Sequence, residues 1–194
     1  MRAWFISVIC LIPLWLPVKG ICKEPTGNIN FAIGALRTAD DFSEAFNLDE
    51  RIEIGTTCDV KMKTWPISIA FKYLLSYGDS KTSGNSYGLR KDMDVDVYCS
   101  ETYVGVRKVL DHFPSVRPFV GGGLYTVNMY VDISYDDEFD TGLGVWVEAG
   151  TYIALARHLD IGILWRWSKA KINVFGTKFD TGGIHFDLLI GYHF

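Results

Sequence analysis

The carboxyl-terminal segment, residues 184–194, alternates strictly between large apolar and polar positions. A two-residue period is typical of a β-strand, whose side chains point alternately to opposite faces of a sheet. We interpret the segment as a strand whose apolar face meets lipid and whose polar face meets a barrel interior. The apolar face holds Ile184, Phe186, Leu188, Ile190, Tyr192 and Phe194, and the polar face holds His185, Asp187 and His193.

Seven earlier segments alternate in the same way, and the connections between successive segments are alternately long and short. Short turns at one end and long loops at the other are expected of an up-and-down barrel. The sequence therefore predicts an all-β fold, an eight-stranded antiparallel transmembrane β-barrel. The predicted strands are residues 28–37, 50–63, 67–77, 93–110, 117–133, 141–157, 160–168 and 184–194, and the predicted long loops are 38–49, 78–91, 134–140 and 169–182.

The fourth predicted strand does not keep one apolar face. Its apolar parity changes from Val95 and Val97 to Val104 and Val106. An extra residue in one strand moves every later side chain to the opposite face, so we expect a β-bulge near residues 99–101. In the fifth strand we expect the apolar face to point toward lipid, with Phe119, Tyr125, Val127, Met129 and Val131 outward.

The amino-terminal residues 1–20 have the organisation of a secretory signal peptide. Arg2 gives a positive start, residues 3–16 are almost wholly apolar, and Val18 and Gly20 occupy the small-residue positions of a cleavage site. The chain is therefore expected to comprise a signal peptide at 1–20, a short periplasmic lead at 21–27 and the barrel at 28–194.

Two alternatives to a cleaved signal stay open. A membrane-spanning helix needs about 20 apolar residues, and this run is shorter and contains prolines. A lipoprotein anchor at Cys22 would place Ile21 where a small residue is usual. Cys58 and Cys99 fall on predicted strands with another strand between them, which argues against a disulfide, and we expect both to be small apolar wall residues.

Composition excludes some classes of partner. Removing residues 1–20 leaves 17 basic and 23 acidic residues, a formal charge of −6, and no basic patch of the kind that nucleic-acid binding requires. No cysteine and histidine have metal-ligand spacing, so the sequence predicts no metal site and no cofactor.

The polar strand faces carry charges of both signs, which can pair inside a narrow barrel. Eight strands enclose a space just wide enough for side chains to fill, so a plugged interior is expected and a narrow conduit for small molecules is the alternative. The predicted interior network contains Arg51, Glu53, Asp59, Lys61, Lys72, Asp94, Asp96, Arg107, Glu148, Arg166, His185 and Asp187.

With these features the chain resembles the small eight-stranded outer-membrane barrels of Gram-negative bacteria, the OmpA/OmpX-type and opacity-like proteins. The residues 104–123 resemble a hairpin common in that class, with Gly105, Arg107, Arg117, Pro118 and three consecutive glycines. The resemblance implies an outer-membrane location, lipid and lipopolysaccharide as partners, and folding by the barrel assembly machinery.

The same resemblance implies an assembly signal in the last strand. Family members end with a polar residue, a glycine and two aromatics at fixed spacing. Asp187, Tyr192 and Phe194 match this pattern, whereas Leu189 stands at the glycine position.

A soluble lipocalin-like barrel is one alternative, because alternation alone does not say which face points inward. Large aromatics near strand ends, as at Trp65, Trp165, Trp167, Tyr192 and Phe194, favour interfacial girdles and therefore a membrane barrel.

A lipid A modifying enzyme is a second alternative, since such chemistry needs a nucleophile and a base near the outer leaflet. His112 and His158 fall in short turns and His193 lies at the chain end, which leaves His185, with Asp187 as its partner. No serine is assigned to this pair, so we expect it to be a buried ion pair.

The predicted loops carry the remaining binding candidates. Asp136, Asp137, Glu138 and Asp140 could hold a cation, but they lack the spacing of an EF-hand. Lys169 and Lys171 could contact lipopolysaccharide phosphates or pair with the acidic loop. The sequence thus predicts a non-enzymatic outer-membrane barrel with an envelope-structural or surface-interaction role through four extracellular loops, whose ligand it does not identify.

Overall fold

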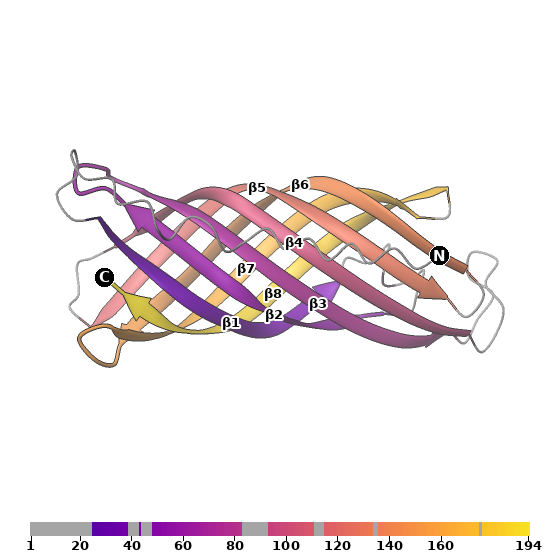
Figure 1. Ribbon diagram of the computed structural model, residues 1–194, viewed down its shortest axis with the longest axis horizontal. Helices are drawn as coiled ribbons and strands as arrows, with labels where there is room; N and C mark the ends of the chain where they lie inside the picture. Colours follow the sequence, from indigo (N-terminus) through magenta and orange to yellow (C-terminus); the bar gives the residue numbers. More distant parts are fainter. Residues whose placement is uncertain are drawn as a thin grey trace, which may run out of the picture.

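Eight antiparallel strands close into a barrel in the computed structural model (Figure 1). The structure describes residues 25–38, 43, 48–82, 93–110, 115–133, 136–174 and 176–194. Each strand pairs with its neighbours in chain order, and pairing of the first with the last closes the barrel. The strands are β1 (Thr26–Thr38), β2 (Glu50–Lys61), β3 (Ser68–Thr82), β4 (Met93–Val109), β5 (Val116–Ile133), β6 (Asp136–Ala154), β7 (Leu159–Val174) and β8 (Thr177–His193).

The two ends of the barrel differ. The starts of β1, β3, β5 and β7 and the ends of β2, β4, β6 and β8 lie at one end, here called the terminal end. The opposite end of the barrel is here called the loop end. Backbone hydrogen bonds between Gly27 and Phe194 complete the seam at the terminal end. No helix within the described ranges is long and apolar enough to span a membrane.

The predicted topology is confirmed, but two of the four predicted long loops are wrong. β6 already begins at Asp136, and β7 and β8 together reach from Leu159 to His193 with only residues 175–176 between them. The predicted loops 134–140 and 169–182 are therefore largely strand. Backbone pairing continues past the point at which the side-chain pattern changes, because a hydrogen-bonded ladder does not require an apolar face.

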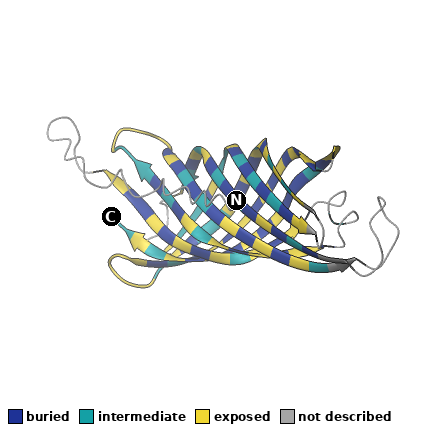
Figure 2. Ribbon diagram, turned by 45° about the vertical axis from the view of Figure 1, so that its right-hand side comes forward, coloured by how far each residue is buried: buried dark blue, intermediate teal, exposed yellow. Residues whose placement is uncertain are grey.

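The outward face of the middle of the barrel is an apolar belt (Figure 2). Yellow exposed and dark blue buried positions alternate along the strands, and the large exposed side chains are mostly apolar. Trp165 and Tyr192 are 46% and 51% exposed on this belt, as the sequence predicted. A closed barrel with an apolar outer surface satisfies all its backbone groups internally and is suited to lipid, which argues against the soluble alternative.

At the loop end the two faces exchange polarity. In β4 Val104 and Val106 point outward, whereas Val95 and Val97 are buried inside. Pairing of β4 with β3 runs without interruption from Ser68↔Arg107 to Thr82↔Met93, so no bulge causes the change, and the predicted bulge is wrong. The side chains keep strict alternation, and their chemistry inverts where the barrel leaves the apolar belt.

A compact apolar cluster fills the barrel interior at the loop end, and we call it the loop-end core. It corrects the prediction for β5, whose side chains at Phe119, Tyr125, Val127, Met129 and Val131 are all buried inside and not directed to lipid. The outward face of β5 is apolar at Val120 and Leu124 but polar at Asn128, so the apolar positions change face along the strand; pairing of Tyr125 with the inward Tyr103 fixes its orientation. The loop-end core contains Leu48, Val95, Val97, Val127, Met129, Val131, Ile172, Val174 and Phe179.

Trp146 of β6 is the largest fully buried side chain among the residues that the structure describes. It fits because β4 and β5 place glycines opposite it: a Cβ at Gly105 would lie 2.7 Å from the Trp146 Cζ2 atom. The indole N–H donates to the Leu124 carbonyl oxygen at 3.0 Å. The glycines of the predicted hairpin therefore make room for an aromatic plug.

The charged interior as the candidate functional site

Buried charged side chains form two groups inside the barrel, each assembled from strands far apart in the chain. Strict alternation directs them inward, because every second residue of β2, β3, β4, β6, β7 and β8 faces the interior. The first group surrounds Arg107 and the second surrounds His185. The Arg107 group comprises Asp59, Lys72, Arg107, Glu148 and Tyr152, and the His185 group comprises Arg51, Glu53, Glu101, Arg166, Ser168, His185 and Asp187.

In the Arg107 group, one guanidinium joins two carboxylates from opposite walls. Arg107 Nη1 lies 2.8 Å from Asp59 Oδ1, and Arg107 Nε donates to Glu148 Oε1 at 2.9 Å. Lys72 pairs with the same Glu148, and its Nζ lies 3.9 Å from the centroid of the Trp146 ring. These side chains are at most 4% exposed, so each charge is compensated by pairing and by a cation–π contact rather than by water.

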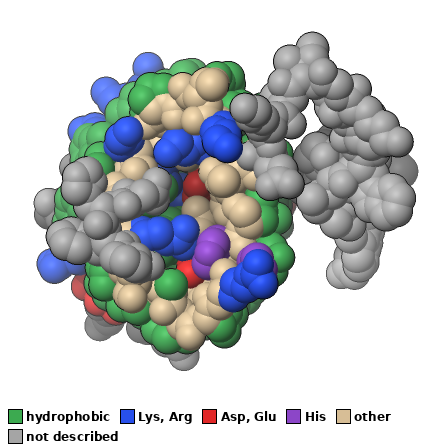
Figure 3. All heavy atoms as spheres, turned by 90° about the vertical axis from the view of Figure 1, so that its left-hand side faces the viewer, with side chains coloured by type: hydrophobic (Ala, Val, Ile, Leu, Met, Phe, Trp, Pro, Cys, Tyr) green, Lys and Arg blue, Asp and Glu red, His purple; other side chains and the backbone are tan. Residues whose placement is uncertain are grey.

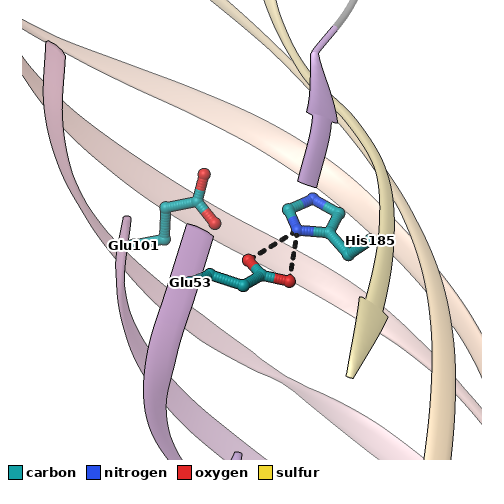
Figure 4. Close-up of side chains that lie close together, drawn as sticks. All are labelled: Glu53, Glu101 and His185. Atoms are coloured by element: carbon teal, nitrogen blue, oxygen red, sulfur yellow. Dashed lines mark hydrogen bonds and ion pairs between the residues drawn. The ribbon is translucent and has the colours of Figure 1, made fainter. Parts of the chain in front are cut away.

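The His185 group has a different arrangement (Figure 4). His185 Nδ1 lies 2.8 Å from Glu53 Oε2, and His185 Nε2 lies 2.8 Å from Ser168 Oγ. Arg166 lies 3.2 Å from Glu53 and 3.6 Å from Asp187. The sequence placed Asp187 beside His185, but in the structure Glu53 from β2 takes that position and Asp187 pairs with Arg166.

Ser168 is an interior residue that sequence reasoning missed. Arg166 of β7 pairs in register with His185 of β8, so Ser168, two residues further along the same face, also reaches the imidazole. Only the register between the two strands reveals this, because the residues are 17 apart in sequence. Ser168, His185 and Glu53 are at most 2% exposed, so the Ser168 hydroxyl is shielded from solvent inside the barrel.

Most of the predicted network lies inside, with three exceptions. Asp96 is outward at the loop end, where it accepts a hydrogen bond of 3.0 Å from the Tyr77 hydroxyl, so its prediction is wrong. The polarity exchange explains the error, since beyond the apolar belt polar residues face out. The side chain of Asp94 lies outside the described residues, and Lys61 is half-buried at the terminal end. The structure adds Glu101 and Asp160 to the buried charges.

At the terminal end the interior opens into a cavity of about 220 Å³. Figure 3 shows basic and histidine side chains surrounding a depression in which acidic side chains are visible. Arg117 forms an ion pair with Asp160, and His193 Nδ1 lies 3.1 Å from the same carboxylate. The Asn28 side chain donates to Asp59 at 3.1 Å, and this pair lies between the cavity and the Arg107 group. The cavity lining is Thr26, Gly27, Asn28, Asp59, Lys61, Ser68, Val109, Arg117, His193 and Phe194.

Comparison with known proteins relates this geometry to solved barrels. No family model and no curated protein matches the chain. Solved structures do. Neisserial surface protein A is 16% identical, with a TM-score of 0.57, over 88% of this chain and 98% of that one. A major outer membrane protein from Thermus thermophilus is 9% identical, with a TM-score of 0.59, over 89% of this chain and 100% of that one.

The attachment invasion locus protein Ail of Yersinia pestis, solved with the heparin analogue sucrose octasulfate, also matches. It is 10% identical, with a TM-score of 0.53, over 89% of this chain and 100% of that one. The fold is that of the small eight-stranded outer-membrane barrels. The match covers 98–100% of each solved chain. Each of those structures is therefore a small barrel, as is the described part of this chain.

The remaining sequence candidates lie on the loop-end part of this outer-membrane-type barrel. Asp137 accepts a hydrogen bond of 3.1 Å from the Tyr130 hydroxyl, and Asp140 accepts one from the Asn173 backbone. Lys169 forms an ion pair of 2.7 Å with Asp180, and Lys171 is exposed. The acidic residues occupy successive positions of a strand and not a loop, and alternation separates their side chains. Asp136 and Glu138 belong to the same strand, β6.

Proposed function

We propose that this chain is a non-enzymatic integral outer-membrane barrel that supports the envelope or presents an interaction surface at its loop end. The observation that carries the proposal is the filled interior. From the terminal end inward, the Arg107 group, Trp146, the His185 group and the loop-end core follow one another along the barrel. A plug of paired charges and apolar side chains suits an anchor better than a pore.

Planar-bilayer recording of the refolded protein tests the filled interior directly. We expect no stepwise conductance, because water and ions would have to displace buried ion pairs and Trp146. Unitary currents that scale with the number of inserted barrels would show that the protein is a conduit and not only an anchor.

Lipopolysaccharide is the partner that we propose for the outward face of β7 and β8. Going toward the loop end, the outward residues change from Trp165 and Trp167 to Lys169 and Lys171, and Lys178 is exposed on the adjacent β8. An aromatic band followed by cations matches a lipid interface followed by phosphates. Lys169 is already paired with Asp180, so Lys171 and Lys178 are the two residues proposed to carry the contact.

A charge-reversal pair tests this contact. We expect Lys171→Glu with Lys178→Glu to weaken co-purification of lipopolysaccharide at least about threefold, in the range of 1 kcal/mol for each surface cation near an anionic membrane. Lys108→Glu, at the terminal end, is the matched control and should leave lipopolysaccharide unchanged. Equal lipopolysaccharide on all three proteins would exclude the proposed contact.

One observation favours a second function, hydrolysis or transfer of an acyl group. Ser168, His185 and Glu53 stand in the order of a nucleophile, a base and an orienting carboxylate, at 2.8 Å for each step. Mass spectrometry of lipid A from cells with and without the protein, together with labelling by a fluorophosphonate probe, distinguishes the two functions. Labelling that Ser168→Ala abolishes, with a changed lipid A spectrum, would support the enzyme; matching spectra and no labelling support the anchor.

A further inference from the structure

Three buried side chains in the His185 group bring atoms that can bind a metal close together. Glu53 of β2, Glu101 of β4 and His185 of β8 each offer a ligand atom, and these atoms all lie within 4.8 Å of one another (Figure 4). The three residues are 1%, 1% and 0% exposed. Metal–oxygen and metal–nitrogen bonds of about 2.1 Å place ligand atoms roughly 3.5 Å apart around a tetrahedral ion, so movements of about 1 Å would complete the geometry.

His185 Nδ1 lies between a hydrogen-bond donor and a carboxylate. Arg166 Nη2 lies 2.7 Å from this nitrogen and can only donate, whereas Glu53 Oε2 lies 2.8 Å from it and, when ionised, can only accept. A nitrogen that carries a hydrogen faces another donor, and one that carries a lone pair faces another acceptor. A metal ion shared by Nδ1 and Glu53 removes the conflict between these two atoms, because both then give a lone pair to the ion. Arg166 can then no longer donate to Nδ1 and must turn toward Asp187.

Glu101 supplies an independent observation. Its Oε2 accepts a hydrogen bond from the Tyr103 hydroxyl, but its Oε1 is buried and has no hydrogen-bond partner. An unsatisfied buried carboxylate oxygen is among the costliest groups that a protein interior can contain. Coordination of an ion would satisfy this oxygen at the place where Glu53 and His185 also converge.

We propose that Glu53, Glu101 and His185 bind one divalent transition-metal ion of the zinc type inside the barrel. An imidazole with two carboxylates suits zinc and its first-row neighbours, whereas calcium and magnesium prefer oxygen ligands alone. Ser168 Oγ, 2.8 Å from His185 Nε2, is placed to accept the other imidazole hydrogen, as the outer partner of a ligating histidine usually does. Arg166 then pairs with Asp187, 3.6 Å away.

The ion would join three strands that are not neighbours. β1 separates β8 from β2, and β3 separates β2 from β4, so coordination links opposite parts of the wall across the interior. Because the ligands are closed off from solvent, the ion would enter during folding and then be retained. The site is therefore structural, and it is independent of whether the barrel anchors or conducts. It excludes the acyl-transfer alternative, because a metal-bound His185 that donates its Nε2 hydrogen to Ser168 has no lone pair with which to act as a base.

Refolding in zinc-buffered solutions measures the affinity of the proposed site for zinc. The mature chain is folded in detergent at a series of free Zn²⁺ concentrations, treated with EDTA after folding, and assayed for metal per folded barrel. We expect one zinc per chain to survive EDTA, and X-ray absorption at the zinc edge to show one imidazole with oxygen ligands. Glu101→Gln should raise the free zinc needed for half-loading by roughly 100-fold, and Ser168→Ala by roughly 10-fold.

Two controls separate this site from general metal binding. Glu148→Gln removes an equally buried carboxylate of the Arg107 group and should leave half-loading within about threefold of the unmodified chain. His158→Gln removes the histidine pair at the terminal end, whose ring centroids lie 5.8 Å apart, and should likewise have no effect. Folding of each variant is verified by heat-modifiable gel mobility.

The proposal is overturned if the folded, unmodified chain retains no zinc, or if Glu101→Gln retains it with unchanged affinity. If Glu101→Gln does not fold, the X-ray absorption spectrum of the unmodified chain is the deciding measurement. A zinc spectrum without an imidazole ligand contradicts the proposed site. Loss of the imidazole signal in His158→Gln would also contradict it, because the zinc would then lie at the terminal end.

Discussion

At the scale of single residues, the barrel depends on charges that have no access to water. Arg107 is fully buried and holds Asp59 and Glu148 together, and its guanidinium carbon lies 4.5 Å from the centroid of the Phe119 ring. Both carboxylates come from other strands, so a single side chain connects three parts of the wall. Removing one partner of such a group leaves the others charged and unpaired, which costs far more than the intact pair contributes.

We expect Arg107→Met to lower the free energy of unfolding by about 3–5 kcal/mol, because buried Asp59 loses its cation and buried Glu148 keeps only Lys72. Urea unfolding of the barrel in lipid vesicles measures the change. Arg157→Met, in the exposed turn between β6 and β7, is the control and should stay within about 0.5 kcal/mol. Equal stability of the two variants would mean that the interior is hydrated.

At the scale of strands, the exchange of polarity marks where the barrel leaves lipid. In β7 the outward residues change from Trp165 and Trp167 to Lys169 and Lys171, while the inward ones change from Arg166 to Ile172. Both halves obey the same rule, that apolar side chains avoid water. Within the bilayer the outside is apolar, and beyond it the inside is the only place for a hydrophobic core.

β5 offers a test with matched neighbours. We expect Val127→Lys to destabilise the barrel by about 3–5 kcal/mol, because it buries an unpaired charge in the loop-end core. Asn128→Lys, at the adjacent outward position, should be tolerated. Equilibrium unfolding of both variants measures this, and tolerance of Lys at 127 with loss of folding at 128 would reverse the assigned faces.

The last strand offers a second test. β8 ends at His193, and Phe194 continues the seam by backbone hydrogen bonds in both directions with Gly27. If Phe194 also belongs to the signal that the assembly machinery reads, deleting it should reduce the amount of assembled barrel in cells severalfold. The fraction of heat-modifiable protein in outer-membrane extracts measures this. Wild-type assembly of the truncated chain would remove Phe194 from the signal.

At the scale of the whole molecule, closure between β1 and β8 makes eight hairpin-paired strands into a barrel. The seam runs in continuous register from Asn28↔His193 to Thr38↔Gly183. At its centre, a Cβ on Gly34 would lie 2.2 Å from the Phe186 carbonyl oxygen and 2.3 Å from Asp187 Oδ1. The close approach of these two strands therefore requires glycine at position 34.

We expect Gly34→Val to prevent closure, so that the protein loses its heat-modifiable mobility and becomes sensitive to protease. The neighbouring Ala35→Val, which points to lipid, should fold as the unmodified chain does. A Gly34→Val barrel that still shifts on heating would show that the seam has room to widen.

The sequence by itself determined the number, order and pairing of the strands, because alternation and turn spacing are local properties. It also identified Arg51, Glu53, Arg107 and Glu148 as interior charges, since polar residues on a membrane strand must point away from lipid. It failed where that rule stops applying. Beyond the belt Asp96 faces outward, and in β5 Val127 faces inward.

Only the tertiary structure decided which interior residues meet. Glu53, Glu101, Ser168 and His185 come from four strands, and their contacts depend on register and on the distance across the barrel, which no local pattern encodes. The sequence paired His185 with Asp187, its neighbour on the same face, whereas closure of the barrel brings Glu53 from 132 residues away. Alternation gives each side chain its direction, and closure gives it its partner.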